Sequence, residues 1–304
     1  MKITDQQYEV VASRSKAGAR EIPADQPSSV AFGILVHLGP IIIPCLILAF
    51  IDFTLFNVIL VTMGFSFLGL GVSLWAARRD PAVDLPPMPV KVLLRAFLWD
   101  ITGKGFGVGL TILFGTYYLL SFISPYAETT APWYKILAAV ALSDLWYYCI
   151  HRWFMHSKGR GSVKKALRKE HSVHHSITDL DFFRGNKGSL IDNGVISFAF
   201  PLAMIGTVLG LSLPGLALAY IILMSIQITH HVNHSFQIGW LKYIIFDSHA
   251  HKMHHCKRGR LVNFAAVFAI WDRLLGTYYE DFDLSPSYMH AHNITLPITP
   301  VRGK

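Results

Sequence analysis

Two five-residue histidine patterns lie eighty residues apart, HSVHH at 171–175 and HKMHH at 251–255. On a helix with 3.6 residues per turn, the first, fourth and fifth positions of each pattern share one face. Neutral imidazoles three or four residues apart on a helix are a known way to hold a transition metal ion. The spacing therefore predicts that both segments are helical and that each presents three imidazoles to a metal site.

Two further histidine blocks precede these patterns. His151 and His156 lie in HRWFMH, and His230, His231 and His234 lie in HHVNH. The chain thus repeats one plan: an apolar hairpin, spaced histidines, a connection, and then H-x-x-H-H. We expect the two halves to be related by a pseudo-two-fold axis along the membrane normal, each supplying five imidazoles to one shared site. Ten imidazoles exceed what one ion can bind, so two ions are expected.

Composition places these histidines in a membrane protein. Of the 304 residues, 52% are hydrophobic and 15% are charged, and the mean hydropathy is +0.40. Six stretches are apolar and long enough to cross a hydrocarbon core of ~30 Å, and short breaks join them in pairs. They are 30–52, 55–77, 106–125, 132–155, 190–212 and 213–235. We therefore expect an all-α integral membrane bundle of about six transmembrane helices in three hairpins, with a histidine-rich helical cap.

The basic residues indicate the orientation, because Lys and Arg near membrane spans remain on the cytoplasmic side. They gather in the first 29 residues, in the 78–104 and 152–189 connections, and after Trp240. Both termini and the histidine clusters are therefore expected in the cytoplasm. The expected divisions are a soluble tail at 1–29, a first hairpin with a basic linker at 30–104, a di-metal catalytic domain at 105–280 and a C-terminal tail at 281–304.

Several other residues have competing interpretations. Asp144 lies seven positions before His151, two helical turns back on the same face. It could hold a ligating imidazole by its second N–H, or it could pair with Tyr148 or a neighbouring helix. His37 stands alone in an apolar span, and we interpret it as a hydrogen-bonded residue of the core. A nucleic-acid partner is not expected, because no basic patch with interleaved aromatic residues lies away from the membrane.

The histidine blocks, in this order and on this hairpin plan, resemble the fatty acid hydroxylase/sterol desaturase superfamily of integral-membrane non-haem di-iron enzymes. DLWYYCIHR at 144–152, NF at 263–264 and WDRLLGT at 271–277 strengthen the resemblance, which covers about residues 130–280. Carried over position by position, the family's metal ligands are His151, His156, His171, His174, His175, His230, His234, His251, His254 and His255. His231 and His249 are surplus: either could lie behind the ligands, or His231 could replace His230.

The resemblance implies two iron ions as cofactor and O2 as cosubstrate, although a purified sample could contain zinc. The implied activity is O2-dependent hydroxylation of an unactivated C–H bond in a lipid or another hydrophobic substrate. Desaturation with the same ligands is the near alternative, and metal transport is a remote one. Because the chain has no dinucleotide, iron–sulfur or haem motif, a separate electron donor such as a ferredoxin or a cytochrome is expected.

Overall fold

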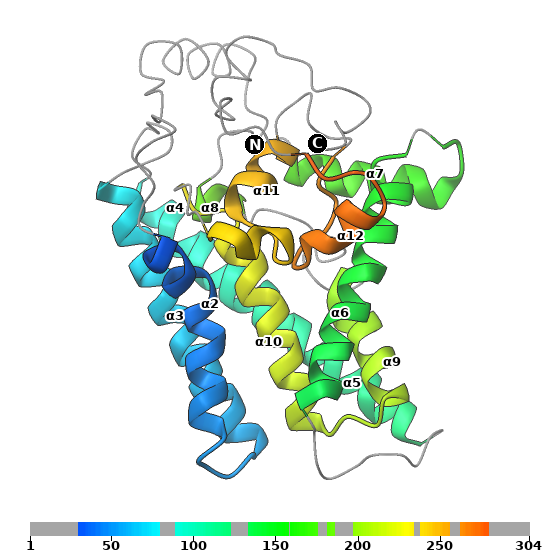
Figure 1. Ribbon diagram of the computed structural model, residues 1–304. Coiled ribbons are helices and arrows are strands. Elements are labelled where there is room, and N and C mark those ends of the chain that lie inside the picture. The colour runs from blue at the N-terminus through cyan, green and yellow to red at the C-terminus, as the bar shows by residue number, and fades with distance from the viewer. Residues whose placement is uncertain are drawn as a thin grey trace.

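The computed structural model describes residues 30–79, 89–122, 133–157, 159–175, 181–185, 197–233, 238–255 and 262–279. Within these ranges every regular element is a helix, which confirms the all-α prediction. Long helices run side by side as a bundle, and short helices form a cap over one end of it (Figure 1).

The first hairpin consists of α2 (Val30–Leu48) and α3 (Leu55–Arg79), close to the predicted stretches 30–52 and 55–77. The two helices pack against each other and against α10. Their outer faces expose large apolar side chains, including Leu35 and Phe56. Such faces suit contact with lipid chains, which are as apolar as the side chains themselves.

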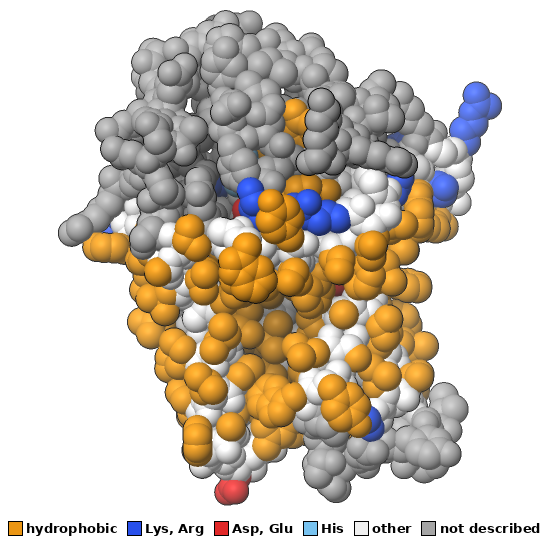
Figure 2. Space-filling model, viewed as in Figure 1, with side chains coloured by type: hydrophobic (Ala, Val, Ile, Leu, Met, Phe, Trp, Pro, Cys, Tyr) orange, Lys and Arg blue, Asp and Glu red, His pale blue; other side chains and the backbone are white. Residues whose placement is uncertain are grey.

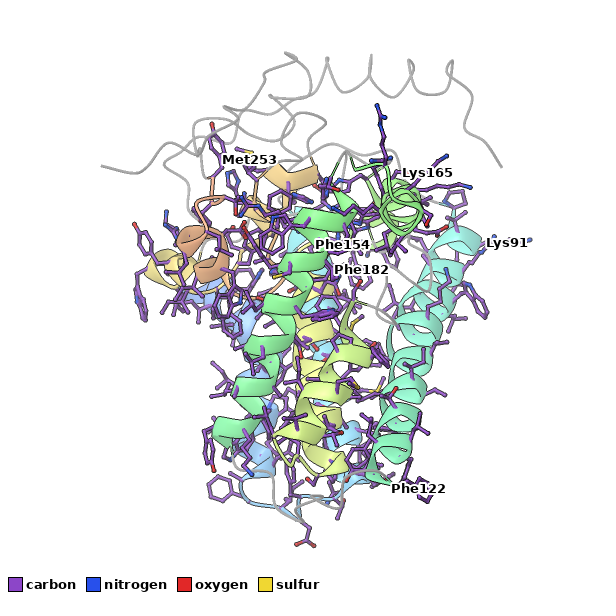
Figure 3. All side chains as sticks on the ribbon, turned by 90° about the vertical axis from the view of Figure 1, so that its right-hand side faces the viewer. Lys91, Phe122, Phe154, Lys165, Phe182 and Met253 are labelled. Carbon is purple, nitrogen blue, oxygen red and sulfur yellow. The ribbon has the colours of Figure 1, made fainter. Side chains whose placement is uncertain are left out.

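The next helix is longer than predicted. α4 (Val90–Arg95), η1 (Ala96–Val108) and α5 (Gly109–Ser121) follow one another without a break, so that Lys91 and Phe122 lie at its two ends (Figure 3). The apolar pattern predicts that this span begins at 106 and that the residues before 105 form a basic linker, whereas the helix begins at Val90. Its basic residues suggested a linker, but long cationic side chains at a helix end can reach past apolar surface to water.

α10 (Leu213–Thr229) is the central helix of the bundle. Every residue from Gly215 to Ile226 is buried, as expected for a helix that is apolar all round. Ser212 begins it by accepting a hydrogen bond from the Gly215 N–H, and Pro214 occupies its first turn. α10 contacts α2, α3, α5, α6 (Trp133–Ile150) and α9 (Phe200–Val208).

Three helical stretches among the described residues are long and apolar enough to cross a membrane: Val30–Leu48, Leu55–Arg78 and Val90–Ser121. Figure 2 shows hydrophobic side chains covering the bundle below the cap. The chain is thus a membrane protein. The helices that correspond to the predicted spans 190–212 and 213–235 are Ser197–Val208 and Leu213–Thr229, which are shorter than the ~20 residues of a full crossing.

The cap contains α7 (Ser162–His174), α8 (Phe182–Gly185), η4 (Gly239–Tyr243), α11 (Ser248–His255) and α12 (Ala269–Leu274). It has a small apolar core of its own, formed by Tyr148, Phe246, Ala250, Phe264, Ala265 and Ala269. Because Tyr148 belongs to α6, this core joins the cap to the top of the bundle.

Candidate metal centre

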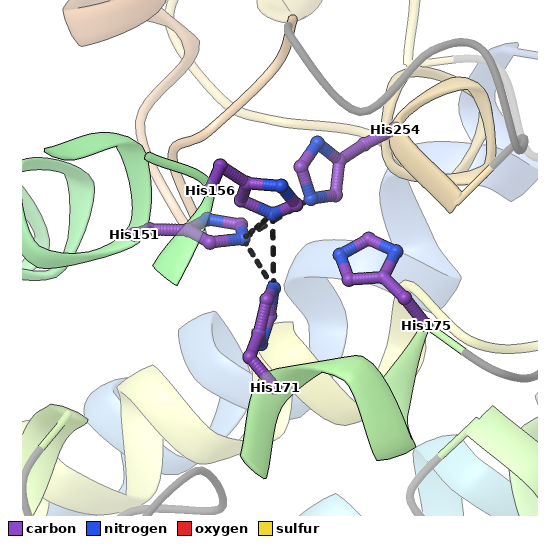
Figure 4. A group of neighbouring side chains, drawn as sticks. All are labelled: His151, His156, His171, His175 and His254. Carbon is purple, nitrogen blue, oxygen red and sulfur yellow. Dashed lines mark hydrogen bonds between the residues drawn. The ribbon is translucent and has the colours of Figure 1, made fainter. Parts of the chain in front are cut away.

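Nine histidines form two neighbouring groups at the cap end of the bundle, eight of them buried and His156 half-buried. Within each group, one ring nitrogen of every member lies within 4.8 Å of the others. Figure 4 shows the rings of the first group converging from separate elements. The first group is His151, His156, His171, His175 and His254, and the second is His174, His231, His251 and His255.

The two H-x-x-H-H segments exchange one histidine each. Both segments are helical, as their spacing predicts, and form the end of α7 and the end of α11. In each, the first and last histidines join one group, whereas the fourth-position histidine joins the other. Thus His171 and His175 share the first group with His254, and His251 and His255 share the second with His174. Neither group can therefore form from one half of the chain alone.

A π-helical turn brings His151 and His156 together. His151 is the first residue of η2 (His151–Met155), and His156 directly follows its last residue. The His156 N–H donates a hydrogen bond to the His151 carbonyl (3.1 Å). In an ordinary α-helix, residues five apart would point about 140° away from each other. With the wider turn, their Nε2 atoms lie 3.1 Å apart, and His171 Nε2 lies 2.9 Å from His151 Nε2. π turns of this kind are frequent at functional sites.

Two backbone carbonyls fix the protonation of two rings in the first group. The Nδ1–H of His151 donates to the Phe264 carbonyl (2.6 Å), and the Nδ1–H of His254 donates to the Val262 carbonyl (2.7 Å). A neutral imidazole carries one proton, so each Nε2 must present a lone pair. These two Nε2 atoms lie 3.1 Å apart. Two facing lone pairs repel each other unless a cation lies between them.

The segment that supplies these carbonyls, residues 262–268, is held by buried carboxylates. Asp144 accepts hydrogen bonds from the N–H groups of Ala266, Val267 and Phe268 (3.0, 2.9 and 2.7 Å). Asp272 accepts from the N–H groups of Phe264 and Ala265 and from the Thr277 hydroxyl. Asp144 thus contacts the backbone of the segment that contains Phe264, whereas its sequence position predicted either contact with a ligating imidazole or a pair with Tyr148 or a neighbouring helix.

Asn263 fixes the same segment at its start. Its backbone has φ +58°, a conformation that asparagine tolerates better than most residues. Its side-chain amide donates to the carbonyls of Ala250 and Tyr279, and its side-chain oxygen accepts from the Tyr279 N–H. The contacts of Asn263 and Asp272 were not predicted from the sequence. The signal for them was the pair of motifs at 263–264 and 271–277, which the resemblance had singled out without assigning a role.

The second group includes His231 in place of His230. His231 donates from Nδ1 to the Gln227 carbonyl (3.0 Å), and its Nε2 lies 3.0 Å from His251 Nε2. His230 instead donates from Nε2 to the Phe246 carbonyl (2.9 Å), and its ring stacks at a tilt against His37. About 100° separates the two side chains around the helix end, so only one can face the group. Among the described residues, His231 and not His230 therefore belongs to the second group.

His249 is buried in α11 but belongs to neither group. His37 is buried in α2, beside His230. His234 lies outside the described residues.

Burial keeps the histidine rings neutral. Desolvation lowers the pKa of His175, His251 and His255 well below the usual 6.5, and the neighbouring histidines lower it further. Neutral rings offer lone pairs to a metal, whereas protonated rings cannot.

Both groups fit transition metal ions. Two nitrogens about 3 Å apart are at the separation of adjacent ligands that each lie ~2.1 Å from one ion. Among the described residues, neither group includes a carboxylate or a thiolate. Imidazole-only sites suit iron, zinc, copper or nickel, so the two groups offer one site for each of two ions.

Comparisons with known proteins agree with this geometry. Residues 136–277 match the family model for fatty acid hydroxylase. The chain is 27% identical over 181 residues to methylsterol monooxygenase 1 of Rattus norvegicus and 26% identical over 181 residues to that of Gallus gallus. Each match covers 57% of this chain, and they cover 58% and 57% of the two relatives, so the chain spans little more than half of their length. No solved structure matches the chain.

Proposed function

The chain belongs to the fatty acid hydroxylase/sterol desaturase superfamily through residues 136–277, and on this premise we propose that it is an O2-dependent membrane oxygenase with a di-iron centre. Its reaction is the hydroxylation of an unactivated C–H bond in a lipid or a similarly apolar molecule. One oxygen atom enters the substrate, and two electrons with two protons convert the other to water. The electrons come from a separate donor, such as a ferredoxin or a cytochrome.

The observation that carries this proposal is the pair of facing lone pairs on His151 and His254. Both rings are oriented by backbone carbonyls, and their Nε2 atoms face each other. Such outer contacts fix ring orientation in metal sites and raise ligand basicity. When bound, two redox-active metal ions supply the O2 chemistry that breaks the C–H bond. The proposed ligands are the nine grouped histidines, and His234 remains a proposed tenth.

Aromatic side chains shield the proposed centre and give it an apolar approach. The Phe264 ring lies 5.6, 5.5 and 5.7 Å from the rings of His151, His156 and His254. The centre of the Tyr147 ring lies 4.9 Å from that of the His151 ring. Tyr147 also stacks on Phe198, which lies two residues before α9 begins. An apolar surround of this kind favours a hydrophobic substrate. The names of the relatives make a methylsterol the first substrate to try.

The proposed topology has both termini and the histidine cap on the cytoplasmic side and six helices in three hairpins. Three stretches of sufficient length support it, as does the packing of α6, α9 and α10 into the same bundle. The shorter helices would cross with the help of flanking residues and local thinning of the bilayer. We propose that the catalytic region lies within residues 105–280, although the helix that carries its first residues begins at Val90, and that the first hairpin is its membrane support.

Purified protein incubated with lipid extract, 18O2 and a chemical or protein reductant tests the reaction. Hydroxylation adds one labelled oxygen atom to a lipid, whereas desaturation removes two hydrogen atoms and leaves no label, so mass spectrometry separates the two. The variant His254→Ala should abolish either product and lower the iron content. The variant His249→Ala, on the same helix but outside both groups, should retain product formation. Metal flux in liposomes without O2 consumption would refute the oxygenase and favour transport.

A further inference from the structure

One edge of the cap combines exposed apolar side chains with cations. It consists of η4 with Ile244 and of α12 with Leu275. The two segments are adjacent in space although they lie about thirty residues apart in the chain. Trp240 is 66% exposed, Tyr243 54% and Leu274 70%, and Ile244, Ile270 and Leu275 are also exposed. We call this surface, residues 239–244 and 269–275, the η4–α12 edge.

The cations of the edge lie among its aromatic rings. The Arg273 guanidinium carbon lies 4.6 Å from the centre of the Tyr243 ring and 3.7 Å from that of Tyr278. Lys242 Nζ lies 5.7 Å from the Tyr243 ring. Among the residues that the structure describes, the nearby carboxylates are Asp247 and Asp272, which are 3% and 0% exposed. Lys242 and Arg273 are themselves half-buried, and no carboxylate of the described residues is exposed on the edge.

Two contacts place the edge at the level where the membrane helices begin. Gly239 of η4 packs so closely on Val30, the first residue of α2, that an added Cβ would lie 2.8 Å from a Val30 methyl carbon. On the other side, Phe268, which caps α12, is bound by Asp144. Asp144 lies seven residues before His151 on α6, or about 10 Å further into the bundle. The start of α12 therefore lies deeper than the first histidine.

Figure 2 shows the consequence on the face where Figure 1 shows α12. Lys and Arg side chains lie along the upper border of the hydrophobic surface there. Aromatic side chains beside cations, at the boundary of an apolar belt, are typical of the membrane–water interface. Cations at this level attract anionic phospholipid headgroups.

We infer that the η4–α12 edge inserts into the cytoplasmic bilayer surface, with its apolar side chains among the upper acyl chains and with Lys242 and Arg273 bound to anionic headgroups. The occupant is lipid because the edge is continuous with the membrane-facing surface of the bundle. This inference rests on the membrane location and not on the proposed reaction. It gives the cap a second anchor, next to the segment that orients His151 and His254.

A depth measurement tests the inference without metal or activity. In a full-length chain with Cys45, Cys149 and Cys256 replaced by Ser, a fluorescent thiol label is attached at Leu274→Cys and the protein is placed in phosphatidylcholine vesicles. Quenchers are spin-labelled lipids, with the nitroxide near the headgroup or deep in the chain, and aqueous iodide. The controls are Val163→Cys on the exposed face of α7 and Leu68→Cys in the middle of α3, both large exposed apolar positions.

The expected result is strong quenching at position 274 by the shallow nitroxide and weak quenching by iodide. Position 163 should respond to iodide and position 68 to the deep nitroxide. Iodide quenching at 274 equal to that at 163 would overturn the inference, and would leave the edge for a protein partner such as an acidic electron carrier. With phosphatidylserine added, shallow quenching should increase at least twofold, and Lys242→Gln with Arg273→Gln should remove the increase. Equal quenching in both vesicle types would overturn the headgroup contact.

Discussion

Replacing Asp144 by Asn should weaken metal binding although Asp144 touches no histidine. The carboxylate accepts three backbone N–H groups: one oxygen accepts from Ala266 and Val267, and the other accepts from Phe268. Asparagine can keep the first pair but must point an N–H2 group at the Phe268 N–H. One charge-assisted hydrogen bond is lost and one buried donor is left opposite another donor.

The magnitude follows from these contacts. A hydrogen bond to a charged group contributes about 1.5–3 kcal/mol, and an unsatisfied buried donor has a similar cost. We therefore expect the free energy of unfolding to fall by about 2–3 kcal/mol. Asp272 still holds Phe264 and Ala265, so the segment should shift without detaching. Changes in contacts that orient a ligand typically weaken metal binding about 10–100-fold.

Competition with a chelator measures metal affinity, and thermal unfolding in detergent measures stability. The matched control is Ser143→Ala, the neighbouring residue on α6, whose buried hydroxyl makes no hydrogen bond to any residue that the structure describes. It should leave both quantities almost unchanged. If Asp144→Asn binds metal as tightly as the unaltered protein while Ser143→Ala also does, the backbone route from Asp144 to His151 is refuted.

Three other changes have defined outcomes. His231→Ala should lower metal content by about one ion per chain, whereas His230→Ala should not; equal losses would contradict the placement of His231. Gly109→Ala should lower the free energy of unfolding by about 1–3 kcal/mol, because the added methyl would overlap the Tyr220 hydroxyl. Thermal unfolding measures this loss. In the control Gly115→Ala, the added methyl meets no atom within 4 Å, so this change should be tolerated. The metal-free protein should lose stability below pH 6.5, by up to ~1.4 kcal/mol per pH unit for each buried cap histidine, because their pKa values lie lower in the folded than in the unfolded state; unfolding midpoints that do not change between pH 7.5 and 5.5 would contradict this.

The sequence predicted the helical character of the two H-x-x-H-H segments because i, i+3 and i+4 positions share a helix face irrespective of the surrounding fold. The same reasoning could not show that His174 and His254 exchange groups. A rotation of some tens of degrees separates these side chains from their neighbours, and the packing of α7 against η2 decides which group each one meets. Local spacing therefore identified the histidines that gather, and the tertiary structure divided them.

The π turn at His151 illustrates a second limit. Its i, i+5 spacing looks unfavourable on an α-helix, and only the wider turn makes it productive. The helical stretch Val90–Ser121 illustrates another limit. Lys91 and Arg95 are typical of a polar linker, yet the helix continues through them without a break. The supporting segment at 262–268 was the least predictable part, since backbone carbonyls carry its contacts to His151 and His254 and no side-chain pattern specifies them.

Anomalous diffraction at the iron absorption edge, from crystals of the protein prepared with iron, tests the central claim most directly. The account predicts two peaks per chain, one within bonding distance of His151 and His254 and the other within bonding distance of His231 and His251. A single peak, or peaks away from these rings, would contradict it.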